Sequence, residues 1–314
     1  MKTFEYIEPK TLDEACVALR RAGAQIIAGG TDLLGVLKDE ILPLSPDTLV
    51  DLKTIPGLEY VEETGDVLKI GAMTRLADIA AEPAVKARYA ALAQAAGLVG
   101  SPQIREMGTI GGNLCQRSRC WYFRVADNRF YCLRKGGRGC PAATGDSRYH
   151  SIFGRSAGCS GVNPSDLAPV LVALDAAIET TKRVIDAEGF FQVKGENSTA
   201  LEDDEIVTEI RIPAAPGRKS AFAKYALRRS IDFPIVNCAV AIDEERARIC
   251  LNAVYGTPYR AVEAEKLIAG KPIDQDLAEA AGDAAVTGAR ALDSNRFKVQ
   301  IAKTLVKRTI LACR

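Results

Sequence analysis

Cysteine is the residue in this chain whose spacing most suggests chemistry, because thiolates bind soft metal ions and iron–sulfur clusters. Five of the nine cysteines lie within 45 residues, separated by 4, 11, 7 and 18 residues: Cys115, Cys120, Cys132, Cys140 and Cys159. The segment has neither the Cys-x2-Cys pair of zinc ribbons nor the closely spaced cysteine run of bacterial ferredoxins. The spacing alone leaves three alternatives open: an iron–sulfur cluster, a zinc site with four cysteine ligands, or free thiols.

The charge of the same segment gives modest support to a metal centre. Seven basic residues and only one acidic residue, Asp127, lie between Cys115 and Cys140. Positive charge lowers thiol pKa values and would offset the negative charge of a cluster. The alternative is a solvated basic loop. The seven are Arg117, Arg119, Arg124, Arg129, Arg134, Lys135 and Arg138.

Two Gly-rich turns could hold phosphate groups. Gly29-Gly30-Thr31 follows a short apolar segment, and Thr109-Ile110-Gly111-Gly112-Asn113 precedes the cysteines. Turns of this kind can direct backbone N–H groups at an anion. A tight turn without a ligand is the alternative, because Gly-Gly-Thr is common.

The remaining candidate residues favour structure over chemistry. His150 is the only histidine, so a mechanism that needs a histidine base has one candidate. We interpret it as a surface or structural residue. Cys16, Cys238, Cys250 and Cys313 are scattered in apolar contexts, which is typical of small core residues.

Length and composition narrow the class of protein. A chain of 314 residues is long enough for two or three domains. With 41 basic and 40 acidic residues, its charge suggests neither a nucleic-acid binder nor a membrane-surface protein. No apolar run is long enough to span a bilayer, and no signal peptide is recognisable. We therefore expect a cytoplasmic protein, unless a signal-bearing partner exports it, and regard disulfides as the less favoured use of the cysteines.

The elements that must position these residues alternate between strand and helix. Thr11 to Glu14 forms a capping box at the start of a helix, and Pro56-Gly57 marks a break. Regular periodicity stops between Asn113 and Asp166, where a long irregular segment is typical of function. The expected strands are 4–7, 25–28, 48–52, 67–71, 176–184, 205–212, 221–227, 236–242 and 247–253; the expected helices are 11–22, from 32, 75–81, 84–98, 167–173, 259–268, 276–288 and 295–312.

Three motifs together resemble a known family. Ile27 to Leu33, Thr109 to Leu114 and Ser165-Asp166-Leu167 are similar, in this order, to the FAD-binding medium subunit of the molybdenum hydroxylases, the family of xanthine and carbon monoxide dehydrogenases. The resemblance implies an α+β protein with a two-subdomain FAD-binding fold of the vanillyl-alcohol-oxidase type and a small C-terminal domain with a three-stranded sheet. The implied boundaries are 1–55, 56–213 and 217–314, with an iron–sulfur insertion at about 115–162.

The insertion separates two motifs that most family members place almost side by side. It resembles the subset whose flavin subunit carries an extra [4Fe–4S] cluster, namely 4-hydroxybenzoyl-CoA reductase and the three-subunit aldehyde oxidoreductases. The resemblance implies that Cys120, Cys132, Cys140 and Cys159 hold this cluster. Cys115 would then be a fifth thiol packed near the flavin.

The resemblance also assigns the flavin site. Backbone amides from Ile27 to Leu33 would surround the FAD pyrophosphate, Asp166 would bind the ribose or adenine side, and Val207 and Lys224 would line the flavin. A plain surface lysine is the alternative for Lys224. The full set of expected FAD-binding residues is Ile27, Ala28, Gly29, Gly30, Thr31, Asp32, Leu33, Gly100, Thr109, Gly112, Asn113, Cys115, Asp166, Val207 and Lys224.

The implied function is electron transfer without substrate chemistry on this chain. A large molybdopterin subunit would act on the substrate, a small subunit would carry two [2Fe–2S] clusters, and an external carrier such as a ferredoxin would exchange electrons with this chain. As a hypothesis, Arg134, Lys135 and Arg138 form a dock for that carrier. The alternatives are a 4-hydroxybenzoyl-CoA-type reductase with reverse electron flow, a stand-alone flavin oxidase, and a zinc-stapled binding module.

Overall fold

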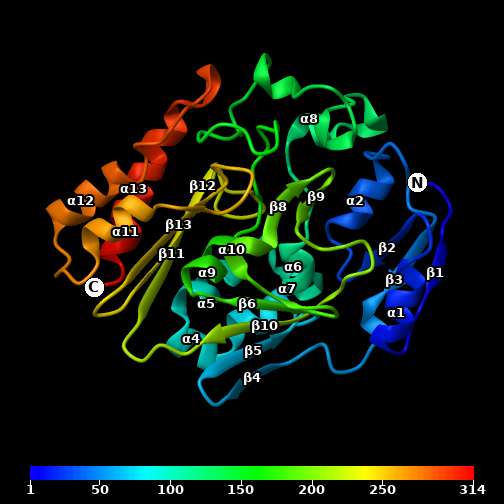
Figure 1. Ribbon diagram of the computed structural model, residues 1–314, viewed down its shortest axis with the longest axis horizontal. Helices are drawn as coiled ribbons and strands as arrows, with labels where there is room; N and C mark the ends of the chain where they lie inside the picture. The colour runs from blue at the N-terminus through cyan, green and yellow to red at the C-terminus, as the bar shows by residue number, and fades with distance from the viewer.

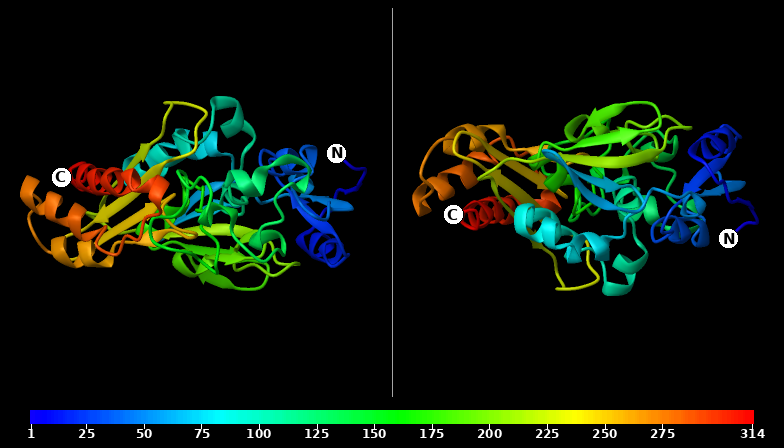
Figure 2. Two further views of the ribbon diagram at one scale, coloured as in Figure 1. Left: turned by 90° about the horizontal axis from the view of Figure 1, so that it is seen from above. Right: turned by 90° about the horizontal axis from the view of Figure 1, so that it is seen from below.

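The computed structural model describes residues 1–314. It has three main parts, each with its own sheet: an N-terminal unit, a central layer and a C-terminal domain. Figure 1 shows the N-terminal unit in blue on the right and the C-terminal helices in orange and red on the left. The two further views in Figure 2 keep the chain termini toward opposite ends of an elongated molecule. None of the helices combines the length and the apolar character needed to cross a membrane.

The N-terminal unit is a parallel three-stranded sheet in the order β1-β3-β2. Thr11 caps α1 by accepting a hydrogen bond from the Glu14 amide, as the capping box predicts. Alanine and leucine side chains of α1 pack on Val50 in a small core. The elements are β1 (Glu5–Ile7), α1 (Leu12–Leu19), β2 (Ala24–Ile27), α2 (Leu33–Lys38) and β3 (Thr48–Asp51).

The central layer is an antiparallel five-stranded sheet in the order β4-β5-β10-β6-β7, with helices on one face. Its apolar side chains share a core with α5 and α9. The elements are β4 (Val61–Thr64), β5 (Val67–Gly71), α3 (Leu76–Ala81), α4 (Pro83–Arg88), α5 (Ala90–Gly97), α6 (Pro102–Met107), α7 (Ile110–Leu114), α9 (Ala168–Ala173), β6 (Ala177–Thr180), β7 (Val184–Asp186), α10 (Ala187–Phe190), β8 (Phe191–Lys194), β9 (Asn197–Thr199) and β10 (Val207–Pro213).

Three expected elements differ from the structure. The single helix expected over 84–98 is two helices, because Tyr89 leaves the helical conformation and buries its ring in the core. The strand expected over 176–184 is a hairpin of β6 and β7. The Gly-rich segment after Thr109 is not an open loop but the short helix α7, capped by the Thr109 hydroxyl.

The C-terminal sheet lies between two sets of helices. In β12, Ala239 and Ala241 face the central core, whereas Cys238 and Val240 face α13. This alternation explains why the strand is apolar throughout, since both of its faces are covered. A two-residue strand, β14, adds to the three strands expected and takes the place of the first residues of the helix expected over 259–268. The elements are β11 (Lys219–Tyr225), β12 (Val236–Ile242), β13 (Ala247–Asn252), β14 (Tyr259–Arg260), α11 (Val262–Ile268), α12 (Gln275–Ala284) and α13 (Phe297–Leu311).

The cysteine-rich segment has little regular structure, as expected. It contains α8 (Trp121–Arg124) and three single turns of 3-10 helix. Phe123 packs on the N-terminal unit beside α2, and Ile152 packs into the C-terminal core. The segment therefore bridges the two ends of the molecule, along the upper edge of Figure 1.

Candidate functional site

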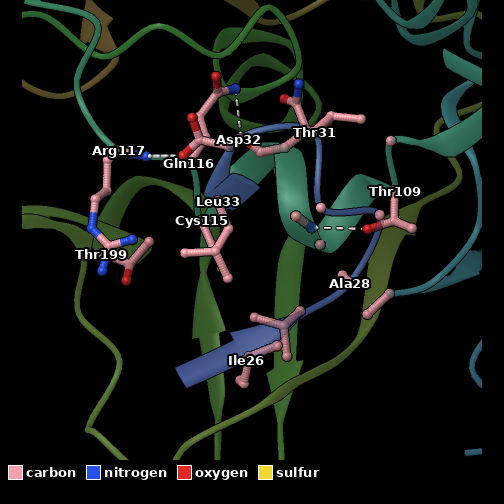
Figure 3. Close-up of a pocket in the computed structure, with 18 of the residues that line it drawn as sticks. Ile26, Ala28, Thr31, Asp32, Leu33, Thr109, Cys115, Gln116, Arg117 and Thr199 are labelled. Atoms are coloured by element: carbon pink, nitrogen blue, oxygen red, sulfur yellow. Dashed lines mark hydrogen bonds between the residues drawn. The ribbon is translucent and has the colours of Figure 1, made fainter. Parts of the chain in front are cut away.

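A cavity of about 530 Å³ lies where the N-terminal unit meets the central sheet. This volume falls within the range of roughly 300–1,000 Å³ that is typical of small-molecule sites. Both Gly-rich segments contribute to its wall, and Figure 3 shows Ala28, Thr31 and Thr109 around it. The structure thus brings together two motifs that are about 80 residues apart in the sequence.

Most of the expected FAD-binding residues line this cavity. Ile27 does not, because its side chain is buried in a small core under the sheet. Lys224 does not line it either but contacts a residue that does. Those that line it are Ala28, Gly29, Gly30, Thr31, Asp32, Leu33, Gly100, Thr109, Gly112, Asn113, Cys115, Asp166 and Val207.

The first Gly turn has the shape that only glycine allows. Gly30 has a φ of +72°, a region that other residues rarely adopt. Gly29 lies against the Met107 carbonyl, and a Cβ at this position would be 1.9 Å from that oxygen. The turn is therefore pressed against the end of α6, which leaves no room for a side chain.

Asp166 is buried at the cavity wall with both carboxylate oxygens occupied. One oxygen lies 2.7 Å from Lys224 Nζ, and the other accepts a hydrogen bond from the Asn237 side chain at 2.7 Å. Burial raises the pKa of Asp166, and these two partners oppose that increase. The residue joins the FAD-binding part to the C-terminal sheet, and its expected contact with the ribose stays a prediction.

Asp32 connects the first Gly turn to the cysteine-rich segment. Its carboxylate accepts a hydrogen bond from the Arg117 amide and forms ion pairs with Arg119 and Arg124, at 2.6 and 2.7 Å. Burial acts to raise the pKa of Asp32, but the two guanidinium groups outweigh it and lower the pKa. Figure 3 shows the bond between Asp32 and Arg117. No local pattern in the sequence indicates this role, because the three arginines lie 85 or more residues away from Asp32.

Four cysteines surround a second, much smaller cavity. Cys120, Cys132, Cys140 and Cys159 line it together with aromatic and aliphatic side chains. Cys115 lies apart from them and faces the large cavity. No three histidine, cysteine or carboxylate side chains of the chain are close enough to hold a single metal ion.

Several N–H groups point at the cysteine sulfurs. The Gly161 amide lies 3.2 Å from Cys159 Sγ. The Cys159 thiol and the amides of Ser160 and Ala142 lower the pKa of Cys140 to about 4 against the effect of burial. The hydrogen bond that the Cys159 thiol donates to the Cys140 sulfur, together with burial, raises the pKa of Cys159. The surroundings therefore favour negative charge on Cys140, whereas burial raises the pKa of Cys120 to about 11.

Two buried cations lie beside the same sulfurs. Arg134 donates hydrogen bonds to the Gly195 and Glu196 carbonyls, in the turn between β8 and β9. Lys135 is 5% exposed, and its Nζ has no hydrogen-bond partner. Burial lowers the pKa of Lys135, whereas the nearby Cys132 and Cys120 sulfurs act to raise it. The expected dock is therefore wrong for Arg134 and Lys135, since neither side chain reaches the surface; only Arg138 is exposed.

His150 is buried rather than on the surface. Its Nε2 lies 3.1 Å from Cys120 Sγ. The other cysteines behave as expected: Cys238, Cys250 and Cys313 are buried in apolar cores, and Cys16 is half-buried against the N-terminal core.

Comparisons with known proteins agree with this architecture. Residues 2–215 match the family model "FAD binding domain in molybdopterin dehydrogenase", and residues 221–313 match "CO dehydrogenase flavoprotein C-terminal domain". The chain is 34% identical to the aldehyde oxidoreductase FAD-binding subunit PaoB of Escherichia coli K12, over 96% of each chain. It is 30% identical to the carbon monoxide dehydrogenase medium chain of Hydrogenophaga pseudoflava, over 98% of this chain and 96% of the relative.

A solved structure of the Hydrogenophaga pseudoflava carbon monoxide dehydrogenase shares the fold. One of its chains superimposes with a TM-score of 0.77 at 29% sequence identity, covering 99% of this chain and 97% of that one. The match extends over the central sheet and the C-terminal domain alike. The chain therefore belongs to the molybdopterin dehydrogenase family, as an FAD-binding oxidoreductase subunit.

Proposed function

We propose that this chain is the electron-transfer flavoprotein subunit of a molybdenum-containing dehydrogenase and carries a [4Fe–4S] cluster in addition to FAD. The single observation that supports the cluster most strongly is the gathering of four cysteines around one cavity beside a buried, unpaired lysine. The Lys135 ammonium group lies 5.3 Å from the centroid of the Phe123 ring but has no hydrogen-bond partner. A buried ammonium group in such a setting is costly, and an anionic cluster bound to these sulfurs would supply a charged partner.

The arrangement supports a cluster better than a single zinc ion. Zinc needs its four sulfurs at about 2.3 Å from one point. The four cysteines share a cavity of about 10 Å³ without converging to that degree, so the cavity must open as a cluster binds. N–H groups directed at sulfur are also a means by which proteins tune clusters. We therefore assign Cys120, Cys132, Cys140 and Cys159 as its ligands.

The large cavity is the proposed FAD site. When bound, FAD exchanges electrons singly or in pairs, and the cluster exchanges them singly. The chain's own residues bind and orient these groups: the Gly29–Thr31 turn offers backbone amides to the pyrophosphate, and Val207 and Cys115 lie on the wall. Arg119 lines the large cavity and directly precedes Cys120, so one short stretch of chain contacts both sites.

The proposed partners are a large molybdopterin subunit, a small subunit with two [2Fe–2S] clusters, and an external carrier such as a ferredoxin. The relatives are named as parts of aldehyde, carbon monoxide and nicotinate enzymes, which supports an aldehyde or a heterocycle as the substrate of the complex. These names describe oxidation, which favours this direction over a 4-hydroxybenzoyl-CoA-type reductase. The near-complete coverage of subunit-sized relatives favours a subunit over a stand-alone oxidase. We also propose the division into units 1–55, 56–213 and 217–314.

Metal and flavin analysis of the purified complex tests the proposal. We expect about eight irons per FAD, about four in the proposed cluster of this chain and about four in the two [2Fe–2S] clusters of the small subunit. Cys132→Ala removes one proposed ligand, and Cys238→Ala removes an equally buried sulfur from an apolar core. Iron should fall in the first variant and persist in the second. Only about four irons per FAD together with zinc, or equal iron in both variants, would refute the cluster assignment.

A further inference from the structure

Contacts of both its side chain and its backbone hold His150 against the proposed cluster site. Its side chain is 1% exposed, and its Nε2 lies 3.1 Å from Cys120 Sγ. The imidazole packs against the rings of Trp121 and Tyr122, whose centroids each lie 5.9 Å from its own and 6.2 Å from one another. These rings restrict rotation of the imidazole, so Nε2 stays directed at the sulfur.

The backbone of His150 is fixed as well. Its carbonyl accepts hydrogen bonds from Lys298 Nζ at 2.9 Å and from the Asn295 side chain at 3.2 Å. Both donors come from the last 20 residues of the chain, and Lys298 is fully buried. The histidine is thus positioned from the side chain and from the main chain.

The position of the ring hydrogen follows from its surroundings. Nδ1 is buried without a hydrogen-bond partner. A cysteine sulfur that is bonded to iron carries no hydrogen and can only accept. The contact with Cys120 is therefore a hydrogen bond only if Nε2 carries the hydrogen.

We propose that His150 donates a hydrogen bond from Nε2 to the Cys120 sulfur and thereby raises the reduction potential of the cluster at that site. This inference rests on the proposed [4Fe–4S] site. Reduction adds negative charge to the cluster and its sulfurs, so the hydrogen bond is stronger in the reduced state. His150 is a positioning residue and not a ligand, because the four cysteines already supply a full set and the ring does not line their cavity.

Two substitutions and a control test the inference in the purified complex. His150→Phe removes the donor and keeps a ring, whereas His150→Gln keeps a side-chain N–H group of similar reach. Tyr149→Phe changes the preceding, partly exposed residue, which has no hydrogen bond from its hydroxyl to the site. Iron content and the cluster's midpoint potential, from an EPR-monitored titration, are measured for each.

We expect His150→Phe to keep its iron and to lower the reduced-to-oxidised ratio at a given potential about tenfold, which corresponds to about 59 mV for a one-electron couple. His150→Gln should recover part of the shift, and Tyr149→Phe and the FAD potential should not change. An unchanged cluster potential in iron-replete His150→Phe overturns the inference, and so does loss of iron from both His150 variants. If only His150→Phe loses iron, the test rests on the cluster potential of His150→Gln. A potential near the wild-type value then supports the inference, and a strongly lowered potential overturns it. A wild-type complex with no iron beyond the two [2Fe–2S] clusters of the small subunit would instead refute the proposed cluster.

Discussion

The two candidate cofactor sites are built in opposite ways. The large cavity is walled by regular elements and by glycines packed against backbone, such as Gly29 against Met107. The cysteine site lies in an irregular segment, with Lys135 unpaired and thiols packed against one another. Backbone packing gives the first site its shape before any ligand binds. The second site gathers buried cations and sulfurs without such packing, so we expect its stability to depend on the proposed anionic ligand.

The largest expected effect tests the rigidity of the first site. In Gly29→Ala the new Cβ would meet the Met107 carbonyl oxygen at 1.9 Å, so the turn must move. We expect FAD affinity to fall at least about 100-fold, or about 3 kcal/mol, with iron content unchanged. Flavin titration of deflavinated protein measures this. Gly35→Ala is the control, because its Cβ meets nothing within 4 Å; a normal affinity in Gly29→Ala would show that the turn is pliable.

The two sites also differed in how far the sequence predicted them. The Gly turns are predictable because a tight turn requires glycine at particular positions in a short stretch of sequence. Most residues expected at the flavin site do line the cavity. The side chains that surround the cysteines are not predictable in this way. Arg134 and Lys135 read as a surface dock because charge in an irregular segment is normally solvated. The burial of Arg134 depends on the turn after β8, about 60 residues further on, which no local pattern predicts. Tyr89 broke an expected helix for a similar reason, since tertiary burial overrode an Ala-rich helical pattern.

A second prediction tests whether the cysteine site depends on its ligand. Lys135→Met removes the unpaired ammonium group and keeps the length of the side chain. The iron-free protein should become more stable by roughly 1–3 kcal/mol, because a buried polar group without a partner is lost. The iron-loaded protein should gain less or lose stability, because the ammonium group no longer neutralises the cluster.

Thermal unfolding of both forms measures the difference. Lys86→Met, at an exposed lysine of α4, should change both forms equally. Equal shifts for Lys135→Met would mean that this lysine does not respond to the ligand.

The smallest expected effect concerns the connection between the sites. Asp32→Asn keeps the shape of the side chain but removes the charge that attracts Arg119 and Arg124. We expect a loss of about 1–2 kcal/mol near neutral pH, since the carboxylate is partly solvated.

The pH dependence identifies the cause of this loss. The folded pKa of Asp32 lies below its ordinary value of 3.8, so its contribution is complete above that value and is lost as the pH falls through the folded pKa. The difference between wild type and Asp32→Asn in urea unfolding should therefore shrink below about pH 4. Asp66→Asn, in the exposed turn between β4 and β5, should show no such dependence. A difference that stayed constant into acid would rule out the charge as its origin.

The contacts of Asn295 and Lys298 have a consequence for the order in which this protein matures. Asn295 donates to the carbonyls of Ser147, His150 and Ser151, and Lys298 joins the His150 and Ala253 carbonyls. Because a chain leaves the ribosome from its N-terminus, the cysteines emerge well before these two residues. The segment that carries His150 thus gains its final supports only near the end of translation. Delivery of the proposed cluster to a completed site would therefore follow translation, and a truncation before Asn295 would leave the cysteines present but without these supports.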